Sequence, residues 1–418
     1  MGRFLAQGWV LAVLLCWPWL GTSPAAAANV VLLLMDDAAA SDVADMPTVR
    51  QLAREGATFD HAYTPSPMCA PSRAVIQTGL YSHRNGVTQN SVRQFVANGD
   101  LAHTFAYGLH AVGVDTGLVG KYVNGAPPSI PGWDSLAVHL EDGGDGDSSV
   151  YYDYVLRIGG EKVAYGHAPG DYSVDVERGF ALRDIGSARG RFLTMLDVGA
   201  PHNPLTPAPR YVRAPGTPRQ NTLVAVDDAL AAIVTQLKRQ GAYDDTYLVV
   251  TSDQGLAFGR NPAKGVPYEG SIRVPLVVKG PGVKAGVVLH QLVNLADLAP
   301  TFLDWMGARP MDVDGRSLAP LLRGSAPAGW RQATPITHER MASAPGVPSW
   351  RGVRTTRYAY WTFEGGSTKL YDMAGDVNQR RNIAGDNPAL TRELAALSAR
   401  LAACTGAACR RLEDQGSE

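Results

Sequence analysis

Three things are scarce in this chain of 418 residues: an excess of charge of one sign, cysteine, and long apolar runs. Its 38 basic and 39 acidic residues leave a formal net charge of −1, so nothing predicts binding to nucleic acid or attachment to a membrane surface. Only four cysteines are present, but 45% of the residues are apolar, and a core of that size needs no disulfide framework. The length suits one large α/β domain, or a large and a small one.

The longest apolar run stands at the N-terminus, where Arg3 precedes the stretch WVLAVLLCWPWL and the small residues of SPAAAAN. A charged start, a short apolar stretch and an Ala-x-Ala end are typical of a secretory signal peptide. We therefore predict that residues 1–28 form one, cleaved after Ala28. The run is too short and interrupted to span a membrane, and no later segment is apolar enough. We expect an exported protein, periplasmic or secreted, without membrane insertion.

In an exported protein, the four cysteines have different expected fates. Cys16 leaves with the signal peptide. Cys404 and Cys409 lie so close in sequence that an oxidising compartment favours a short-loop disulfide between them. Cys69 is then left without a partner. An unpaired cysteine in an exported protein is either buried and inert or chemically used, and both interpretations stay open at this point.

Between residues 29 and 325, continuous apolar runs alternate with helical patterns. Buried strands are predicted from the segments NVVLLLM, RFLTMLDV, TYLVVTS and RVPLVV, which start at residues 29, 191, 246 and 273. Helices are predicted over residues 47–56, 222–241 and 295–307. This alternation predicts an α/β fold with a large, mostly parallel sheet sandwiched by helices.

The pattern of the sequence changes near residue 325, from alternating strands and helices to strand-like segments with little helix. We place an approximate domain boundary there. Residues 326–418 contain the strand-like segments WRGVRTTRYAYWTF and TKLYDM, followed by one long helical pattern. This order predicts a small C-terminal α+β domain, with an antiparallel sheet and a terminal helix, after a larger domain of residues 29–325. The acidic stretch 141–149 has Asp147 at the sixth position counted from Asp142, where an EF-hand loop requires glycine, so it is predicted to be a solvated loop.

Carboxylates follow two of the predicted strands. Asp36 and Asp37 come directly after the first strand, and Asp253 ends the strand that starts at residue 246. Sites in open α/β sheets form beyond the carboxyl ends of strands, so these acids predict a site for a hard cation such as Ca²⁺ or Mg²⁺. The alternative, that the first pair only caps a helix, stays open. Asp227 and Asp228 lie in mid-helix and are predicted to be structural or solvated.

Cys69 stands at the start of a predicted short helix, because Pro71 suits a first helical turn and SRAVIQTG continues the pattern. The positive end of a helix dipole binds anions and stabilises negative charge on a nucleophile. Arg73, one turn further on, is placed to form a fork of hydrogen bonds to an oxyanion. A functional cysteine and a small buried cysteine beside a surface arginine are equally compatible with these residues.

The segment CAPSRAVIQTG, from Cys69 to Gly79, resembles the signature of the sulfatase family: Cys-x-Pro-Ser-Arg, four residues, Thr-Gly. Further segments over nearly the whole chain resemble family motifs: NVVLLLMDD, GKYVNG, GAPHNPLTPAPRY, VVTSDQG, KGVPYEGSIRVPLVVKGPG, LADLAPTFLDWMG, DGRSLAPLL and LYDMAGDVNQRRNIA. The forms GKYVN and PHNPLTPAP look most like the N-acetylglucosamine-6-sulfatase branch. The resemblance implies an alkaline-phosphatase-like fold.

The resemblance also implies a chemical use for Cys69. In sulfatases, a maturation enzyme oxidises the cysteine of this motif to formylglycine, whose aldehyde hydrates to a gem-diol. One hydroxyl attacks the sulfur of a sulfate ester and gives a covalent sulfated enzyme. The other hydroxyl then expels sulfate and restores the aldehyde, which a plain serine or cysteine cannot do. The implied partners are a formylglycine-generating enzyme and a sulfated small molecule or glycan.

A metal site follows from the same resemblance. Asp36, Asp37 and Asp253, with residue 69, would ligate one divalent cation, most often Ca²⁺ in this family, which would act as a Lewis acid on a sulfate oxygen. Besides the three aspartates and residue 69, the family usually has an Asn ligand, or His in some members, at the position where this chain has Gln254. Glutamine offers the same carbonyl oxygen on a longer arm, so binding would survive with a shifted cation.

Four basic residues match the substrate-binding motifs of the family. Arg73 would stabilise the formylglycine and hold charge near the metal. Lys121 and Lys264 would contact the sulfate. His202 would bind sulfate and protonate the leaving oxygen.

The leading hypothesis is a sulfuric ester hydrolase that acts on a carbohydrate or aryl sulfate. One alternative is a phosphonate or phosphate ester hydrolase of the same superfamily with the same nucleophile. Another is a catalytically silent protein that binds sulfated glycans. That last interpretation is favoured only by Gln254 and by Val123 and Ala257, which stand where many members have histidine.

Overall fold

The structure is a computed structural model that describes residues 1–2, 28–140, 150–257, 263–325, 327 and 329–415. The predicted signal peptide, apart from its end residues, and the acidic stretch 141–149 lie outside the described residues. Within the described part of the chain, no helix has both the length and the apolarity that crossing a membrane requires.

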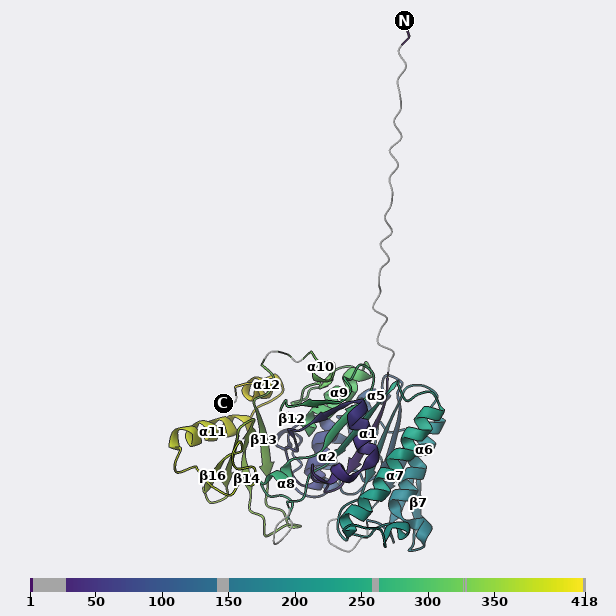
Figure 1. Cartoon of the computed structure of the whole chain (residues 1–418), viewed down its shortest axis with the longest axis horizontal. Helices are drawn as coiled ribbons and strands as arrows, with labels where there is room; N and C mark the ends of the chain where they lie inside the picture. Colours follow the sequence, from purple (N-terminus) through teal and green to yellow (C-terminus); the bar gives the residue numbers. More distant parts are fainter. Residues whose placement is uncertain (3–27, 141–149, 258–262, 326, 328, 416–418) are drawn as a thin grey trace.

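A large mixed sheet forms the centre of the molecule (Figure 1). Within the described residues it has ten strands, which follow one another in space as β11 (Val287–Leu289), β2 (Ala57–Phe59), β10 (Leu276–Lys279), β9 (Thr246–Ser252), β1 (Asn29–Met35), β8 (Phe192–Val198), β4 (Asp115–Gly120), β5 (Ser135–His139), β6 (Val155–Ile158) and β7 (Glu161–Ala164). The central strands β9, β1, β8, β4 and β5 run parallel to one another. β10 is antiparallel to β9, and β6 and β7 form an antiparallel edge.

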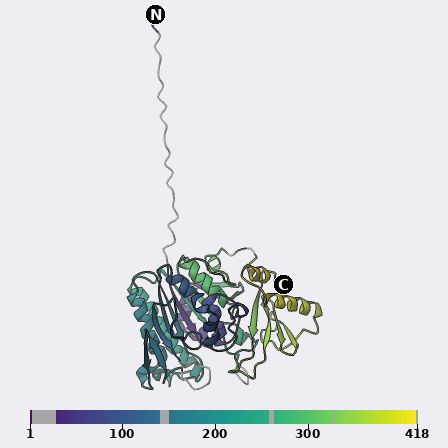
Figure 2. The same cartoon turned by 180° about the vertical axis from the view of Figure 1, so that it is seen from behind.

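Helices cover both faces of this sheet, as predicted. Figure 1 shows one layer in front of the sheet, with α1 (Pro47–Glu55), α6 (Ser173–Ser187) and α7 (Pro218–Arg239). Figure 2 shows the opposite layer, which contains α2 (Cys69–Thr78), α3 (Ser82–Asn85), α4 (Val92–Ala97), α5 (Phe105–His110), α9 (Leu298–Trp305) and α10 (Ala319–Leu322). Alternate side chains of β1 enter the two apolar cores, so the strand is buried on both faces, which explains its continuous apolar sequence.

A smaller antiparallel sheet lies at one end of the large one (Figure 1). Its strands are β13 (Ala333–His338), β14 (Trp350–Thr355), β15 (Tyr358–Phe363) and β16 (Thr368–Asp372). The helices α11 (Pro388–Leu401) and α12 (Ala407–Glu413) follow it, and α8 (Glu269–Ile272) and the strand pair β3 (Ala62–Tyr63) and β12 (Val293–Asn294) lie between the sheets. The predicted fold class is confirmed, and the predicted disulfide joins Cys404 to Cys409. We keep the boundary near residue 325 as a proposal.

The parallel centre of the large sheet determines where polar side chains gather. β1, β8 and β9 are neighbours and run in one direction, so their carboxyl ends lie at one edge. Asp36 follows β1, Asp197 lies at the end of β8, and Asp253 follows β9. The backbone N–H of Asp253 donates to the Met35 carbonyl at 3.1 Å, which fixes two of these strand ends side by side.

The mid-helix pair on α7 supports a first prediction. The Asp227 carboxylate accepts hydrogen bonds from the backbone N–H groups of Thr48 and Val49 at 2.9 and 3.3 Å, so it caps the first turn of α1 from another helix. We expect Asp227→Ala to lower the free energy of unfolding by about 1–2 kcal/mol, measured by urea denaturation. Asp228→Ala is the matched control, because Asp228 pairs with Arg210 at the surface and should contribute less. Equal losses in the two variants would contradict the capping role.

Candidate active site

Cys69 is the first residue of α2, and its side chain is buried at the carboxyl edge of the sheet. Its sulfur is 3.5 Å from Asp36 Oδ1, 3.2 Å from Gln254 Nε2 and 3.3 Å from Lys264 Nζ. It is the one free cysteine within the described residues. The structure therefore places the cysteine at a helix N-terminus, as predicted, and in contact with three of the other candidate residues.

The thiol of Cys69 is poorly suited to act as a nucleophile. Burial raises its pKa, and the neighbouring Asp36 carboxylate raises it further, while Lys121 and Lys264 act in the opposite direction. A raised pKa keeps the group as a thiol at neutral pH, and the thiolate is the nucleophilic form. The position therefore suits a residue whose reactivity does not depend on losing a thiol proton.

Three buried carboxylates line the site: Asp36, Asp37 and Asp253. Ligand atoms of the first two and of Cys69 all lie within 4.8 Å of one another. Asp37 has a φ of 68°, in the left-handed region that non-glycine residues rarely adopt, and its backbone N–H donates to Asp253 Oδ1 at 3.1 Å. Arg219 donates to its carbonyl oxygen. These contacts stabilise an unfavourable backbone conformation of Asp37. As a result the side chains of Asp36 and Asp37 both lie in the same site.

Two lysines neutralise the acidic pair. Lys121 forms an ion pair with Asp36, and Lys264 Nζ lies 3.1 Å from Asp37 Oδ2. Burial alone would raise the pKa of Asp36, but Lys121 and Arg73 outweigh it and hold the pKa well below its usual range. Burial alone would lower the pKa of Lys264, but Asp37 raises it well above the usual value. Asp36, Asp37 and the two lysines are therefore charged at neutral pH. Burial raises the pKa of the third carboxyl group, Asp253, to about 8.

Arg73 is fully buried on α2, and its guanidinium is occupied by protein groups. Its Nε and Nη2 donate to the two carboxylate oxygens of Asp197 at 3.0 and 2.9 Å, and Nη1 lies 2.7 Å from Asp253 Oδ2. This geometry corrects the residue-based expectation of a fork onto a free oxyanion, because the fork is already filled. Burial alone would lower the pKa of Arg73, but Asp197 and Asp253 raise it well above the usual range, so it supplies permanent positive charge.

Sequence reasoning missed Asp197. The signal was present, since this aspartate interrupts the apolar run FLTMLDV one residue before its end, close to the strand end where the three recognised acids also lie. Its partner stands 124 residues earlier in the chain. Nothing in the local pattern links the two, so only the tertiary contact assigns Asp197 its role of orienting Arg73.

The oxygen atoms at this edge fit a hard cation. Besides the carboxylates, Gln254 Oε1 is buried and accepts no hydrogen bond from the described residues, while Nε2 of the same amide donates to Asp37 Oδ1 at 2.6 Å. Rotation about the last side-chain bond exchanges the two amide atoms and would turn the unused oxygen toward Asp37. Carboxylate and amide oxygens are the ligands that Ca²⁺ prefers, so the residues present suit the cation that the sequence predicts.

His202 lies beside the same carboxylates, with Nε2 3.7 Å from Asp37 Oδ2. Burial lowers its pKa, with Asp36 acting in the opposite direction, so the ring is neutral at neutral pH. Nδ1 is 2.6 Å from the Asn203 carbonyl, which can only accept, and the proton is therefore on Nδ1. Nε2 must consequently gain a proton before it can donate one to a leaving oxygen.

Two positions noted as departures add no polar group. Val123 is fully buried in the apolar core on the α2 face of the sheet, and Ala257 pairs through its backbone with Ala263. Neither replaces a histidine by another hydrogen-bonding side chain.

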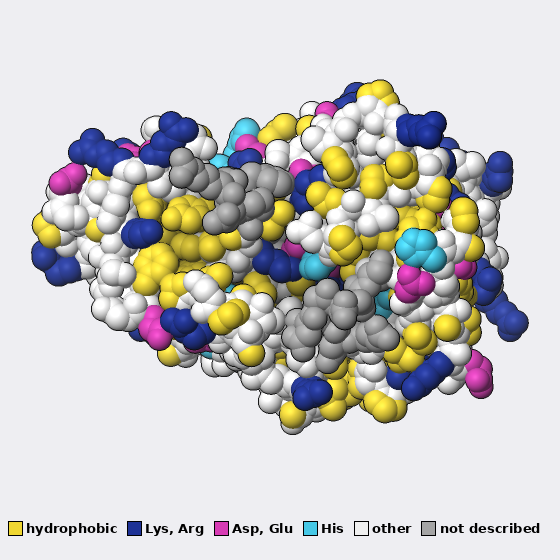
Figure 3. All heavy atoms as spheres, turned by 90° about the horizontal axis from the view of Figure 1, so that it is seen from below, with side chains coloured by type: hydrophobic (Ala, Val, Ile, Leu, Met, Phe, Trp, Pro, Cys, Tyr) yellow, Lys and Arg dark blue, Asp and Glu magenta, His cyan; other side chains and the backbone are white. Residues whose placement is uncertain are grey.

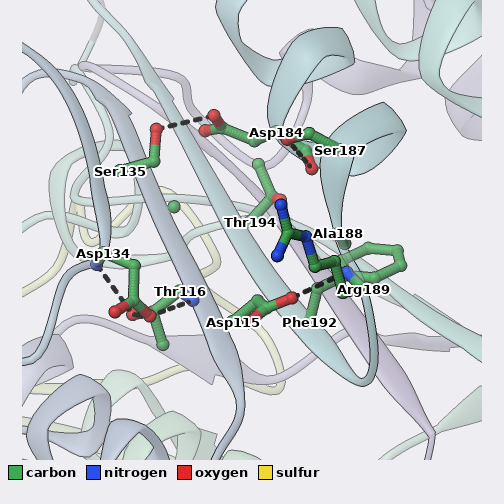
Figure 4. Close-up of a pocket in the computed structure, with 11 residues that line it drawn as sticks. Asp115, Thr116, Asp134, Ser135, Asp184, Ser187, Ala188, Arg189, Phe192 and Thr194 are labelled. Atoms are coloured by element: carbon green, nitrogen blue, oxygen red, sulfur yellow. Dashed lines mark hydrogen bonds between the residues drawn. The ribbon is translucent and has the colours of Figure 1, made fainter.

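Figure 4 shows a different cavity, of about 340 Å³, at the amino ends of β4, β5 and β8. Its acids are each held by protein groups: Asp115 accepts from the Arg189 backbone, Asp134 from Thr116, and Asp184 from Ser135. This cavity lies at the opposite edge of the sheet from Cys69 and is separate from the candidate active site.

Comparisons with known proteins agree with this geometry. A family model described as Sulfatase matches residues 28–308, and one described as N-sulphoglucosamine sulphohydrolase, C-terminal, matches residues 263–405. The chain belongs to the sulfatase family. It is therefore a sulfuric ester hydrolase, and the resemblance seen in its sequence is confirmed.

Several relatives are similar over most of this sulfatase. The N-acetylglucosamine-6-sulfatase of Homo sapiens is 30% identical over 478 residues, covering 91% of this chain and 86% of the relative. The extracellular sulfatase SULF-1 homolog of Drosophila melanogaster is 32% identical over 70% of this chain, which is 31% of that longer relative. A solved structure of a protein with its substrate, D-glucosamine-2-N,6-O-disulfate, has a TM-score of 0.79 at 24% identity, covering 89% and 97% of the two chains.

A buried histidine of the smaller sheet lies against this site. His338 ends β13, and a β-carbon added at Gly265 would stand 2.9 Å from its ring and 3.2 Å from the Met68 sulfur. Gly265 follows Lys264 in the chain, and Met68 precedes Cys69. Neither ring nitrogen of His338 has a partner among the described residues, and burial lowers its pKa from 6.5 to about 4.

The second prediction follows from this lowered pKa. The folded protein favours neutral His338, so its contribution to stability is present above pH 6.5 and is lost as the pH falls through about 4. We expect His338→Phe to abolish this part of the acid sensitivity, which amounts to about 3 kcal/mol between pH 7 and pH 4. Urea denaturation at several pH values measures it. The exposed His290 provides the control variant, His290→Phe, and identical pH slopes for wild type and His338→Phe would refute the prediction.

Proposed function

We propose that this sulfatase hydrolyses the 6-O-sulfate ester of an N-acetylglucosamine-type sugar in a sulfated glycan. The observation that carries the proposal is the position of Cys69, at the start of α2 and within 3.5 Å of Asp36, Gln254 and Lys264. The relatives named N-acetylglucosamine-6-sulfatase, and the structural neighbour bound to a 6-O-sulfated glucosamine, support this class of substrate. The SULF-1 relative is named an extracellular sulfatase, which supports export of this chain.

Formylglycine derived from Cys69 is the proposed nucleophile, which requires a formylglycine-generating enzyme in the host. Asp36, Asp37, Asp253 and Gln254, together with residue 69, would hold one Ca²⁺, which when bound supplies a Lewis acid for a sulfate oxygen. The structural support is the set of buried oxygen atoms at one sheet edge, among them the unpartnered amide oxygen.

The proposed roles of the basic residues follow from their surroundings. Lys121 pairs with Asp36 and Lys264 with Asp37, both beside residue 69. The two lysines would bind the sulfate oxygens. Arg73 maintains positive charge beneath the site through its buried ion pairs. His202 would bind sulfate and, once protonated, donate to the leaving oxygen.

The charge balance of the site favours a singly charged ester. Counted in their ionised forms, the charged groups are four carboxylates and three cations: Asp36, Asp37, Asp197, Asp253, Arg73, Lys121 and Lys264. Burial raises the pKa of Asp197 to about 7 and that of Asp253 to about 8, while Arg73 acts in the opposite direction on both. Four negative and three positive charges leave −1, and one divalent cation would change this to +1. A sulfate monoester carries one negative charge, so its binding would complete the neutralisation of a buried site.

The third prediction tests the nucleophile. Cys69→Ala should lower sulfate release from N-acetylglucosamine 6-sulfate at least about 10³-fold, measured by ion chromatography. Cys69→Ser should be nearly as poor, because a sulfated serine has no second hydroxyl with which to expel sulfate. The matched control is the double variant Cys404→Ala, Cys409→Ala, which removes the two cysteines away from the site and should keep its turnover. In the wild type, mass spectrometry of the tryptic peptide 55–73 should show residue 69 as the lighter aldehyde.

Activity assays, a second substrate and the chemical state of residue 69 together separate the other interpretations. Retained turnover in Cys69→Ala would exclude the mechanism. Preference for an aryl phosphonate ester by orders of magnitude would favour the related phosphonate hydrolase. An unmodified cysteine and glycan binding without sulfate release, in a host that matures other sulfatases, would favour a silent binding protein.

The fourth prediction tests the cation. Gln254→Ala should weaken Ca²⁺ binding by about tenfold or more, measured by calorimetry on protein stripped with a chelator, because it removes one oxygen ligand. Stripping should abolish sulfate release from the wild type, and added Ca²⁺ should restore it. Gln332→Ala is the control, because within the described part of the chain that side-chain amide donates to the Trp330 carbonyl and to no group of the site. Unchanged affinity in Gln254→Ala would remove Gln254 from the ligand set.

A further inference from the structure

Hydrogen bonding between β1 and β8 continues a short way past the ends of the two strands. The backbone N–H of Asp36, the first residue after β1, donates at 3.2 Å to the carbonyl of Ala200, two residues after β8. Within the described residues, this is the last backbone–backbone hydrogen bond between the two segments. Asp37 and His202, which both belong to the candidate active site, lie beyond it. Strand pairing therefore does not fix their relative position.

A guanidinium from a third element supplies the next link. Arg219 lies near the start of α7 and is buried. Its Nη2 donates to the carbonyl of Asp37, and its Nη1 donates to the carbonyl of Pro201 at 3.2 Å. Pro201 directly precedes His202. One side chain thus joins the two segments through their backbones at the point where strand pairing has stopped.

Asp42 fixes this guanidinium from the other side. Its Oδ2 accepts from Nε and Nη2 of Arg219 at 3.2 and 2.7 Å, and from the backbone N–H of Ala39 at 2.8 Å. The chain that leaves Asp37 therefore turns back onto the same arginine. The bonds of Arg219 leave from three nitrogens in one rigid plane, an arrangement that the single ammonium group of lysine cannot reproduce.

The bridge made by Arg219 determines where two functional side chains lie. The residue Asp37 is held on both sides, because its N–H donates to Asp253 Oδ1 at 3.1 Å and its carbonyl accepts from Arg219. The ring of His202 has its Nε2 3.7 Å from Asp37 Oδ2. A displacement of a catalytic group by about 1 Å can lower a rate on the order of 10²-fold.

Arg219 acts from behind the surface that a substrate meets. Figure 3 views the molecule from below, toward the carboxyl edge of the large sheet, where basic and histidine side chains are visible in a central hollow. The side chain of Arg219 is only 10% exposed, and it donates to Asp42 and to two backbone carbonyls. Its influence on a bound substrate is therefore indirect, through the residues that it holds.

We propose that Arg219 is a positioning residue of this sulfatase, which fixes the Asp37 carboxylate and the His202 ring relative to one another. The proposal rests on the proposed function, which gives these two residues their roles as a cation ligand and as the donor to the leaving oxygen. Arg219 then contributes to the affinity for the cation and to turnover, although it contacts neither the cation nor the substrate.

The first arm of the test measures the bridge itself. Arg219→Lys keeps the positive charge and removes the fork. We expect amide hydrogen exchange, followed by mass spectrometry, to become at least about tenfold faster in the peptides that contain Asp36 and His202, because the backbone bonds of both residues lose their support. The matched control is Asp227→Ala on the same helix, which should speed exchange at the start of α1 and leave these two peptides at the wild-type rate.

The second arm measures the consequence for the site. Calorimetry on protein stripped with a chelator should show Ca²⁺ binding weakened about tenfold in Arg219→Lys, the loss typical when an outer partner of a metal ligand is removed. At saturating Ca²⁺, kcat for N-acetylglucosamine 6-sulfate should fall about tenfold or more, with a smaller change in KM, because Lys121 and Lys264 keep their places. A loss of stability alone changes neither the Ca²⁺ affinity nor kcat of the folded molecules, and Asp227→Ala should keep both.

A milder variant keeps the test valid if Arg219→Lys does not fold. Asp42→Asn leaves the arginine in place and replaces its charged partner by a neutral one, so it should cause a smaller loss of the same kind. It is measured in both arms against the same control.

The two arms distinguish failure of this proposal from failure of the proposed function. If the wild type neither binds Ca²⁺ nor releases sulfate, the proposed function fails, and faster exchange in the Arg219 and Asp42 variants still supports the bridge. Wild-type exchange rates at Asp36 and His202 in both variants would overturn the proposal. In an active wild type, so would a Ca²⁺ affinity and a kcat in these variants equal to those of Asp227→Ala.

Discussion

A single buried guanidinium holds the candidate active site together. Arg73 stands on α2, and its charge is shared by Asp36, Asp197 and Asp253, at the ends of three neighbouring strands. Removing one partner of a buried ion pair typically costs about 3–5 kcal/mol, because the other charge is left without compensation. The helix and the three strand ends therefore stabilise one another, and the position of Cys69 at the start of α2 depends on this network.

The same network explains how Cys69 can remain unpaired. Cys69 is too deeply buried to form a disulfide with another chain, and burial with a carboxylate beside it raises its pKa, which suppresses the reactive thiolate. The site therefore keeps the Cys69 side chain as an unreactive thiol. In the proposed function, the chemistry would belong to the formylglycine made from Cys69, which Lys121, Lys264 and the carboxylates surround.

The smaller sheet contributes to this site more than its place at the end of the chain suggests. Arg331, just before β13, is buried between Asp297 and the Glu413 carboxylate of α12, so the last helix joins a buried charge network with the residue that precedes α9. This docking brings His338 and Trp350 against the loop of Lys264. Nothing in the sequence of these strands indicated that they contact the loop that carries Lys264.

Local patterns in the sequence determined the fold class, the helix that starts at Cys69, the strand-end acids and the disulfide, because apolar periodicity, capping and motif spacing act over a few residues. Tertiary structure decided the rest. It turned the fork of Arg73 onto Asp197, 124 residues away, instead of leaving it open to a substrate, and it paired β10 antiparallel to β9. The physical reason is that burial and charge pairing depend on which distant segments meet, and an apolar strand has the same sequence pattern in either direction.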